Sequence, residues 1–383
     1  MTDNIKPNKR STHGGDIYTG SEGVIFTDLS SNINPGSIPG EVYEKLPEML
    51  EMARAYPDLE YKRLKEGLSK YLTSLSEGTE YKNNITSEMI IVGNGASEVT
   101  DKYISLFKRI VLPVPSFKEY ELSANRYGID TAYIDIYPDK EPRDTTIKDS
   151  RGKSFFERIK KEMNPGSLLI LTNPNNPDGQ KLKITDLIDY LEAAEKQSWF
   201  TLIDETFGEY LGNSDMALNL TGRFNNLAVV KAMTKFFCLP GLRLGYMVTK
   251  NQDLLSRLDQ LQTPWSVGTF EENIALIMLK DKAFRAESIA ENEKNKAYLL
   301  ENIKNIDFFS EVYHSDSNFV MLRLRENCGT AKKLAHFLRS KNILVRELSD
   351  MQGLSGDYIR IAVKDREKTD LLLVNLMLYI PNY

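Results

Sequence analysis

The chain has 383 residues, of which 41% are hydrophobic, and its net charge is −5. A chain of this length is expected to bury a large core and to form more than one domain. The basic cluster Lys6–Arg10 is too short to indicate nucleic-acid binding, and no apolar run suits a membrane span or a signal peptide. Two cysteines and three histidines exclude a disulfide framework and a histidine-rich metal site, so we expect a cytoplasmic protein without a metal.

Short apolar runs alternate with amphipathic segments in the first two thirds of the chain. We expect strands at Met89–Val92, Arg109–Pro113, Thr131–Ile136, Leu168–Thr172, Phe200–Asp204, Leu227–Lys231 and Leu244–Val248. We expect helices at Ser97–Phe107, Phe117–Tyr127, Phe155–Glu162 and Ile184–Lys196. This alternation favours an α/β fold whose mostly parallel, seven-stranded sheet is covered by helices on both faces. The last strand follows too closely for a crossover helix, which indicates an antiparallel strand.

The pattern changes after Trp265. Glu271–Lys304 is long, charged and free of proline, as suits a helix that connects two domains. Strands at Asn318–Leu324, Ile343–Arg346 and Tyr358–Val363, with a helix at Thr330–Ser340, then indicate a smaller α+β domain. We therefore expect an N-terminal segment over residues 1–44 that packs with the small domain, a large domain over 45–270, and the connecting helix with the small domain over 271–383.

Glycine-rich or polar turns follow four of the expected strands, at the edge where open α/β sheets bind ligands. The first of these turns, Gly93–Glu98, leads into a helix. Free backbone N–H groups at a helix N-terminus bind anions such as phosphate, and Ser97 could add its hydroxyl. An ordinary glycine turn with Ser97 as the helix cap is the alternative.

The other three turns present an amide, a carboxylate and a lysine. Asn173–Gly179 contains two Asn-Pro steps, which favour a turn that presents amide side chains at the end of a strand. Asp204 closes an apolar strand, where a carboxylate needs a positive partner, although a helix N-cap explains it equally well. Thr234 and Lys235 follow the next strand, and Arg243 comes eight residues after Lys235.

Lys235 lies among mostly apolar residues in the stretch Ala232–Tyr246. A free ammonium group is costly to bury, whereas a desolvated lysine is nucleophilic toward an aldehyde. An anion cradle, an amide, a carboxylate and a lysine at one sheet edge suit a ligand with a phosphate, a phenolic oxygen, a pyridine nitrogen and an aldehyde. Pyridoxal phosphate has these groups, and we expect Lys235 to bind it covalently.

The ordered motifs Asn-Pro-Asn-Asn-Pro-x-Gly, Asp-Glu and Thr-Lys-x6-Leu-Arg-x-Gly-Tyr resemble those of the class I/II aminotransferases, which are fold-type I pyridoxal phosphate enzymes. The resemblance covers nearly the whole chain. It implies that Lys235 carries the cofactor and moves protons, and that Asp204 pairs with the pyridinium nitrogen. It also implies that Asn176 binds the phenolic oxygen and that Phe117 stacks on the ring. The residues around the cofactor phosphate would be Gly95, Ala96, Ser97, Thr234 and Arg243.

Two further residues gain a role from the same resemblance. Tyr56 resembles the tyrosine that reaches the cofactor phosphate from a second subunit, which implies a homodimer with shared active sites. Arg360 matches the arginine that holds the substrate carboxylate. Ala232 departs from the family pattern, because relatives usually have a serine or threonine at this position.

Three other stretches resemble the threonine-phosphate decarboxylases of cobalamin biosynthesis, namely Thr12–Ile17, Leu29–Pro35 and Thr263–Val267. Phe207 does so too, since many related aminotransferases have a tyrosine there. The resemblance implies decarboxylation of L-threonine O-3-phosphate to aminopropanol phosphate, or of L-serine O-phosphate to ethanolamine phosphate. Histidinol-phosphate aminotransferases share most of the cofactor motifs, and their reaction is the alternative.

Arginine suits bidentate recognition of phosphate and carboxylate groups. We therefore expect Arg346 and Arg360 to bind the substrate, with His13 and Asn32 as further candidates from the N-terminal segment. For Arg346 a surface ion pair is the alternative. The sequence does not distinguish threonine phosphate from serine phosphate, which differ by one methyl group.

Overall fold

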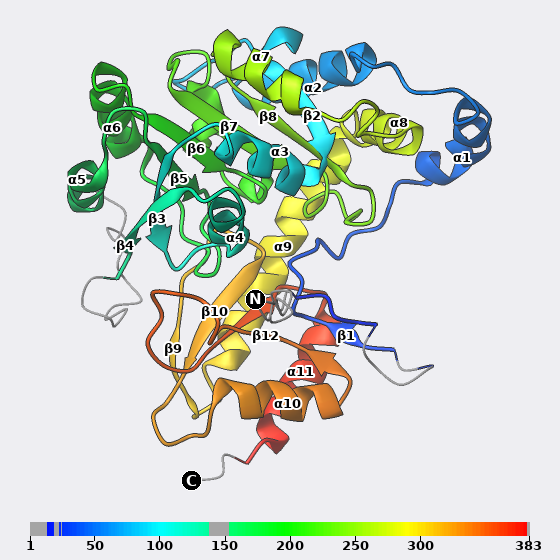
Figure 1. Ribbon diagram of the computed structural model, residues 1–383. Coiled ribbons are helices and arrows are strands. Elements are labelled where there is room, and N and C mark those ends of the chain that lie inside the picture. Colours follow the sequence, from blue (N-terminus) through cyan, green and yellow to red (C-terminus); the bar gives the residue numbers. More distant parts are fainter. Residues whose placement is uncertain (1–13, 19–22, 24, 138–152, 381–383) are drawn as a thin grey trace, which may run out of the picture.

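The computed structural model describes residues 14–18, 23, 25–137 and 153–380 of the chain. The fold has a larger and a smaller part, and the long helix α9 (Lys282–Ile303) runs from one to the other (Figure 1). The larger part contains a seven-stranded sheet and the smaller part a four-stranded sheet. No helix among the described residues is long and apolar enough to cross a membrane.

The large sheet contains all seven strands expected from the sequence. In spatial order they are β2 (Ile90–Asn94), β8 (Leu244–Val248), β7 (Leu227–Ala232), β6 (Phe200–Asp204), β5 (Leu168–Thr172), β3 (Arg109–Val114) and β4 (Asp130–Asp135). β8 runs antiparallel to both of its neighbours, and the other neighbouring pairs are parallel. The mostly parallel sheet and the direction of its last strand are thus confirmed.

Helices cover both faces of this sheet because its strands are apolar on both faces. On β5, Leu168 and Ile170 pack in one hydrophobic cluster, whereas Leu169 and Leu171 pack in another. This alternation follows from the two-residue period of a strand. The first cluster also includes residues of α3 (Gly95–Ile104), α4 (Glu119–Arg126) and α7 (Gln252–Leu261). The second includes residues of α1 (Gly40–Met52), α2 (Lys62–Leu75), α5 (Lys153–Glu162), α6 (Ile184–Lys196) and α8 (Thr269–Met278).

The smaller, C-terminal part has its own core and its own sheet. Its strands are β12 (Arg346–Glu347), β13 (Tyr358–Ala362), β10 (Phe319–Leu324) and β9 (Phe309–Val312), and its helices after α9 are α10 (Ala331–Ser340) and α11 (Arg366–Leu378). The N-terminal strand β1 (Thr27–Asp28) pairs with β11 (Ile343–Leu344). The N-terminal strand β1 therefore packs on the smaller part, whereas the expected boundaries at residues 44 and 270 stay a prediction.

The expectation of one connecting helix over Glu271–Lys304 is wrong. Two helices, α8 and α9, occupy this stretch and meet around Asp281. The Asp281 side chain accepts a hydrogen bond of 2.9 Å from the backbone N–H of Phe284 and so caps the start of α9. Short 3-10 helices, which were also not expected, lie at Ser87–Met89, Gly208–Tyr210, Asn213–Asp215 and Ala217–Leu220.

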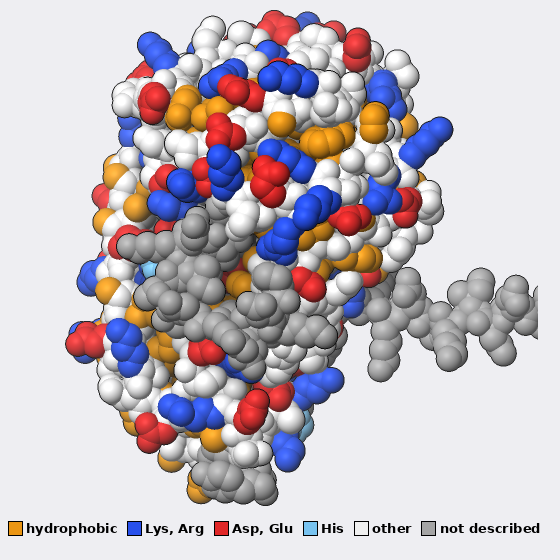
Figure 2. All heavy atoms as spheres, turned by 90° about the vertical axis from the view of Figure 1, so that its left-hand side faces the viewer, with side chains coloured by type: hydrophobic (Ala, Val, Ile, Leu, Met, Phe, Trp, Pro, Cys, Tyr) orange, Lys and Arg blue, Asp and Glu red, His pale blue; other side chains and the backbone are white. Residues whose placement is uncertain are grey.

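The surface shows no large region of a single charge sign on the face drawn in Figure 2. Lys and Arg side chains alternate there with Asp and Glu side chains over the described residues. This mixture agrees with the small net charge of −5.

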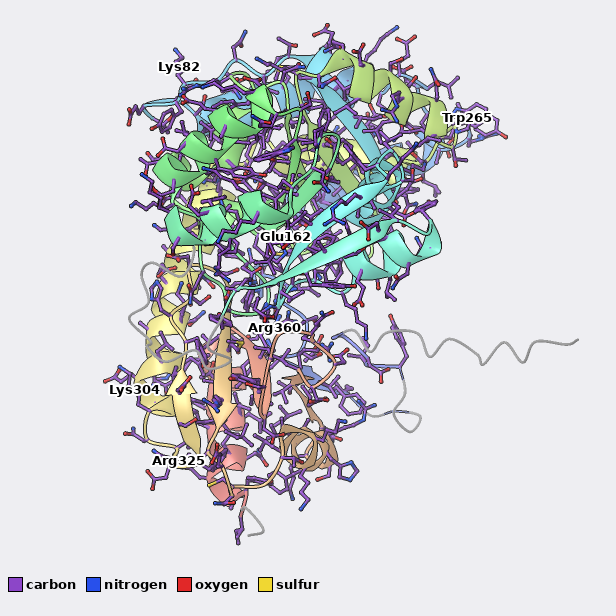
Figure 3. All side chains as sticks on the ribbon, turned by 60° about the vertical axis from the view of Figure 1, so that its left-hand side comes forward. Lys82, Glu162, Trp265, Lys304, Arg325 and Arg360 are labelled. Atoms are coloured by element: carbon purple, nitrogen blue, oxygen red, sulfur yellow. The ribbon has the colours of Figure 1, made fainter. Side chains whose placement is uncertain are left out.

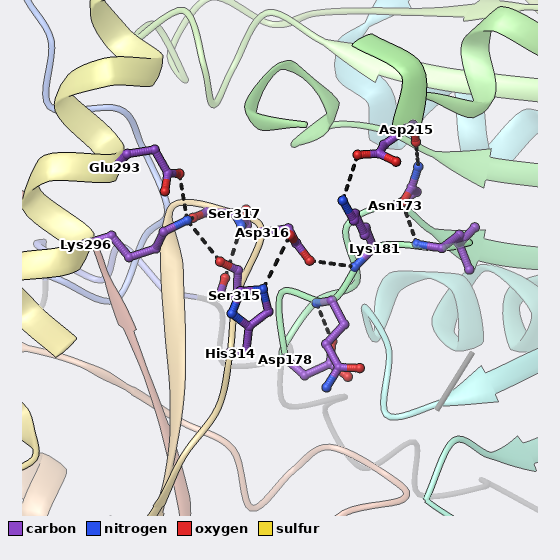
Figure 4. A network of polar contacts seen from close by, with 12 residues as sticks. Asn173, Asp178, Lys181, Asp215, Glu293, Lys296, His314, Ser315, Asp316 and Ser317 are labelled. Carbon is purple, nitrogen blue, oxygen red and sulfur yellow. Dashed lines mark hydrogen bonds and ion pairs between the residues drawn. The ribbon is translucent and has the colours of Figure 1, made fainter. Parts of the chain in front are cut away.

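A polar network joins the two parts of the fold beside α9 (Figure 4). The backbone N–H of Asp316 donates to the carbonyl of Gly179 over 2.8 Å, and the Asp316 carboxylate accepts from the backbone N–H of Lys181 over 3.3 Å. Lys296 of α9 donates to the carbonyls of Ser315 and Ser317 over 2.9 and 3.2 Å. The loop that precedes β10 is therefore held on the turn that follows β5.

Gly179 makes this close approach possible. A Cβ atom at this position would lie 2.0 Å from Ser315 Oγ, and the backbone has a φ of +74°. Gly166 has a similar φ of +80° but nothing within 4 Å of its Cβ position. Both glycines thus have a left-handed backbone conformation, but only Gly179 lies against the other part of the fold, at Ser315.

We expect Gly179→Ala to lower the free energy of unfolding by roughly 2–4 kcal/mol, from left-handed strain and overpacking together. Gly166→Ala should cost about 1 kcal/mol, from the strain alone. Denaturant titration of both variants measures the difference. Equal losses for the two glycines would contradict the close contact at Gly179.

Candidate active site

A cavity of about 660 Å³ lies at the carboxyl ends of the central strands, where the two parts of the fold meet. Most of the expected site residues line it. They are Asn32, Ala96, Ser97, Phe117, Asn176, Asp204, Thr234, Lys235, Arg243, Arg346 and Arg360. The structure thus brings together residues that are more than 300 positions apart in the sequence.

Lys235 lies three residues beyond the end of β7 and is partly accessible from this cavity. Its backbone is fixed by the N-terminal segment, because the Lys235 carbonyl accepts from Asn34 N over 3.0 Å. Burial, followed by the positive charges of Arg360 and Arg243, lowers the pKa of the Lys235 amine to about 8. The amine is therefore easier to deprotonate, and so more nucleophilic, than an ordinary lysine amine.

Asp204 is the last residue of β6, and both of its carboxylate oxygens accept hydrogen bonds. Oδ1 accepts from the backbone N–H of Thr206 over 2.8 Å, and Oδ2 accepts from the Tyr120 hydroxyl over 2.6 Å. Burial and the neighbouring Asp204 charge raise the pKa of Tyr120 well above its ordinary value, so the phenol stays a donor. These two bonds fix the direction in which the carboxylate faces the cavity.

Tyr120 was not expected at this site from the sequence. The available signal was its spacing, because Tyr120 comes three residues after Phe117 at the start of an expected helix, where such residues are neighbours. The two rings pack edge to face with centroids 5.6 Å apart. Tyr120 therefore supports the expected ring-stacking residue as well as the carboxylate.

The glycine-rich turn after β2 forms a cradle at the N-terminus of α3. Gly95 has a φ of +79°, and a Cβ atom on it would lie 2.5 Å from the guanidinium of Arg243. Only glycine allows this arginine to approach the helix N-terminus so closely. The backbone donors of α3 and the cation of Arg243 converge here, as a phosphate requires.

Arg360 of β13 lies between the two parts of the fold, facing the large sheet (Figure 3). It donates to the Asn176 side-chain oxygen and, over 3.0 Å, to the Ser30 carbonyl. Arg346 of β12 lies directly opposite Arg360 in the antiparallel pairing of the two strands. Burial and the nearby charge of Arg346 lower the pKa of Arg360 to about 9. Two arginines are therefore side by side at one wall of the cavity.

The expected site residues from the first 60 positions of the chain differ from one another in where they lie. Asn32 is buried and lines the cavity. Tyr56 is 79% exposed, does not line the cavity, and stacks on Trp265 with ring centroids 4.4 Å apart. Trp265 lies at the outer edge of the large part, far from Arg360 (Figure 3). His13 lies outside the described residues.

The lining of this cavity fits pyridoxal phosphate. The cradle at Gly95 suits the phosphate, the fixed Asp204 carboxylate suits a pyridinium nitrogen, and the Lys235 amine suits the aldehyde. Phe117 lines the same cavity and offers an aromatic face for the ring. The phosphate, the ring nitrogen and the aldehyde of the cofactor would thus each have a separate partner among the residues of the site.

We expect Tyr120→Phe to weaken pyridoxal phosphate binding by roughly fivefold to tenfold, because the Asp204 carboxylate loses a hydrogen-bond donor. Tyr103→Phe is a matched control, since Tyr103 is also buried and its hydroxyl has no hydrogen-bond partner among the described residues. Titration of the cofactor-free protein by absorbance measures both affinities. An unchanged affinity in Tyr120→Phe would show that the hydroxyl does not support the carboxylate.

Comparisons with known proteins agree with this site. The sequence model of the family described as aminotransferase class I and II matches residues 24–376. A protein of Caldanaerobacter subterraneus named as a threonine-phosphate decarboxylase is 32% identical over 94% of this chain and 92% of its own length. Histidinol-phosphate aminotransferase 2 of Archaeoglobus fulgidus is 30% identical over 90% of this chain and 91% of its own length.

A solved structure shows the same fold at a similar level of identity. The histidinol-phosphate aminotransferase from Clostridium acetobutylicum superposes with a TM-score of 0.81 and 31% sequence identity, covering 91% of this chain and 97% of its own. Names of both enzyme types therefore occur among relatives of about equal similarity. The match over most of the sequence, together with the fold and the lining of the cavity, shows that the chain belongs to the class I and II aminotransferase family.

Proposed function

We propose that this protein is a pyridoxal phosphate-dependent enzyme that decarboxylates an O-phosphorylated amino acid. The substrate is L-threonine O-3-phosphate, giving aminopropanol phosphate, or L-serine O-phosphate, giving ethanolamine phosphate. The observation that carries the proposal is the pair of arginines, Arg346 and Arg360, that lie opposite each other on β12 and β13 and line one cavity. Both side chains are at least nine-tenths buried.

Two neighbouring buried cations suit a ligand with two anionic groups, because each cation can then contact one anionic group of the ligand. A phosphorylated amino acid carries a carboxylate and a phosphate. Histidinol phosphate carries a phosphate but no carboxylate, so it would offer an anion to only one of the two arginines. The pair therefore favours the amino acid over the amine.

The roles of the chain's own residues follow from their positions. Bound pyridoxal phosphate supplies a ring that accepts the electron pair left when a bond at the substrate's α carbon breaks. Asp204, held by Tyr120 and Thr206, would pair with the ring nitrogen. Lys235 holds a removable proton at Nζ and can donate it to the α carbon after carbon dioxide has left.

The choice of the bond depends on how the substrate is held. Only a bond perpendicular to the plane of the ring can release its electrons into it. Arg360, which donates to Asn176 and to the Ser30 carbonyl, would hold the substrate carboxylate against one wall of the cavity. Arg346 would then hold the phosphate, and the two contacts together would orient the carboxylate for loss as carbon dioxide.

An aminotransferase that acts on histidinol phosphate is the second candidate. The TM-score of 0.81 with the Clostridium acetobutylicum enzyme favours it. The same lysine, carboxylate and phosphate cradle would serve that reaction, which removes a proton in place of the carboxylate.

A shared active site between two copies of the chain is also part of the proposal. Tyr56 is exposed, and so are Tyr43, Leu50 and Leu59 on and beside α1, at the outer edge of the large part (Figure 1). A second copy that covered this apolar surface would bury it. Tyr56 would then be free to reach the phosphate cradle of the partner.

The test is a product assay on the purified protein supplied with pyridoxal phosphate. We expect carbon dioxide and an amino-alcohol phosphate from O-phospho-L-threonine or O-phospho-L-serine without any keto acid, and no product from Lys235→Ala. The substrate that is converted faster shows whether the enzyme prefers the threonine or the serine side chain. The absence of carbon dioxide, with glutamate consumed in the presence of the keto precursor of histidinol phosphate, would establish the aminotransferase instead.

A further inference from the structure

Arg346 already has an anionic partner within the chain. Its Nη2 donates to both carboxylate oxygens of Asp350, over 2.7 and 2.8 Å. Its Nη1 donates to the backbone carbonyl of Glu347. Both terminal nitrogens of the guanidinium thus contact other parts of the same loop and strand. A phosphate that binds in the usual two-pronged manner must replace at least one of these contacts.

The Arg346–Asp350 pair is largely removed from water. The side chains of Arg346 and Asp350 are 10% and 22% exposed. In such surroundings two like charges at contact distance repel strongly, because little solvent screens them. A phosphate dianion that reached Arg346 with Asp350 still in place would therefore meet an unfavourable neighbour.

A second cation lies within reach of Asp350. Lys118, at the start of α4 in the large part, has its Nζ 4.0 Å from Asp350 Oδ2, and its side chain is 31% exposed. Lys118, Met351 and Arg346 all line the cavity. A small rotation of the Asp350 side chain would exchange one cation for the other without leaving the carboxylate unpaired.

The loop that carries Asp350 is fixed by its backbone. Gly353 has a φ of +86°, and a Cβ atom on it would lie 2.8 Å from the carbonyl carbon of Val114 at the end of β3. Met351 N donates to the Leu348 carbonyl over 3.0 Å. The backbone of the loop can therefore stay in place while the Asp350 side chain turns.

We propose that the Asp350 carboxylate competes with the substrate phosphate for Arg346. Asp350 pairs with Arg346 in the free enzyme and releases it when the substrate phosphate binds. This inference rests on the proposed function, because it assigns the phosphate to Arg346. Asp350 then sets how strongly the enzyme prefers phosphorylated ligands over unphosphorylated ones. It also keeps the two neighbouring arginines from facing each other without a counter-charge in the absence of substrate.

The chain offers a matched control in Glu347. It is adjacent to Arg346 on β12, so its side chain points to the opposite face of the sheet, and it does not line the cavity. Glu347→Gln removes the same charge as Asp350→Asn at nearly the same place in the sequence. Any general effect of net charge on an anionic ligand appears in both variants.

The experiment is equilibrium dialysis of the cofactor-loaded protein with O-phosphoethanolamine and, separately, with ethanolamine. Neither probe contains a carboxylate, so the result does not depend on decarboxylation. We expect Asp350→Asn to tighten O-phosphoethanolamine binding by about tenfold or more, while ethanolamine binding stays the same. Glu347→Gln should change neither affinity by more than about twofold. If Asp350→Asn does not fold, as judged by its thermal unfolding, Asp350→Ser replaces it.

Three results would overturn the inference. The first is unchanged O-phosphoethanolamine binding in Asp350→Asn. The second is weaker O-phosphoethanolamine binding in this variant, which would mean that Asp350 supports Arg346. The third is an equal increase in the affinity of Asp350→Asn for O-phosphoethanolamine and for ethanolamine. The wild-type protein tests separately the part of the proposed function on which the inference rests, namely the binding of a phosphorylated ligand. If neither the wild type nor Asp350→Asn binds O-phosphoethanolamine better than ethanolamine, both the assignment of the phosphate to Arg346 and the competitor role of Asp350 are wrong. If the wild type prefers the phosphorylated probe but the variant does not differ from it, only the competitor role is wrong.

Discussion

Positive charge concentrated between the two parts of the fold governs this site. Lys235 and Arg243 come from the loop between β7 and β8, Arg360 comes from β13, and all three line one cavity. Burial, followed by the charges of the two arginines, lowers the pKa of the Lys235 amine to about 8. A negative charge acts in the opposite direction, since Asp28 of β1 raises the same pKa. Such an arrangement costs folding energy unless anions bind, which is the expected situation for a site that takes a cofactor phosphate and an anionic substrate.

The fold provides this arrangement through three structural features. Parallel strands β5, β6 and β7 end at one edge, which places Asn176, Asp204 and Lys235 near one another. The antiparallel pairing of β12 and β13 places two arginines opposite each other. The N-terminal segment then closes the site, because β1 pairs with β11 and Asn34 binds the carbonyls of Lys235 and Phe236.

Much of this could be predicted from the sequence because the signals are local. An apolar run followed by a polar turn defines β5 and β6, whose bounds Leu168–Thr172 and Phe200–Asp204 agree with the structure. The contacts that could not be predicted depend on tertiary structure. The Tyr120–Asp204 bond requires the packing of α4 on the sheet, and the Arg346–Asp350 pair requires the loop after β12. The break between α8 and α9 depends on one capping aspartate in a sequence that otherwise favours a helix.

The most direct test of the account is the rate at which the cofactor-free protein captures pyridoxal phosphate at different pH values. Capture requires the neutral amine of Lys235, so we predict a rate that rises with pH to a midpoint near 8. Arg360→Met should move this midpoint upward, because the variant lacks the larger of the two arginine contributions. A midpoint near the ordinary lysine value of 10.5, unchanged in Arg360→Met, would contradict the account.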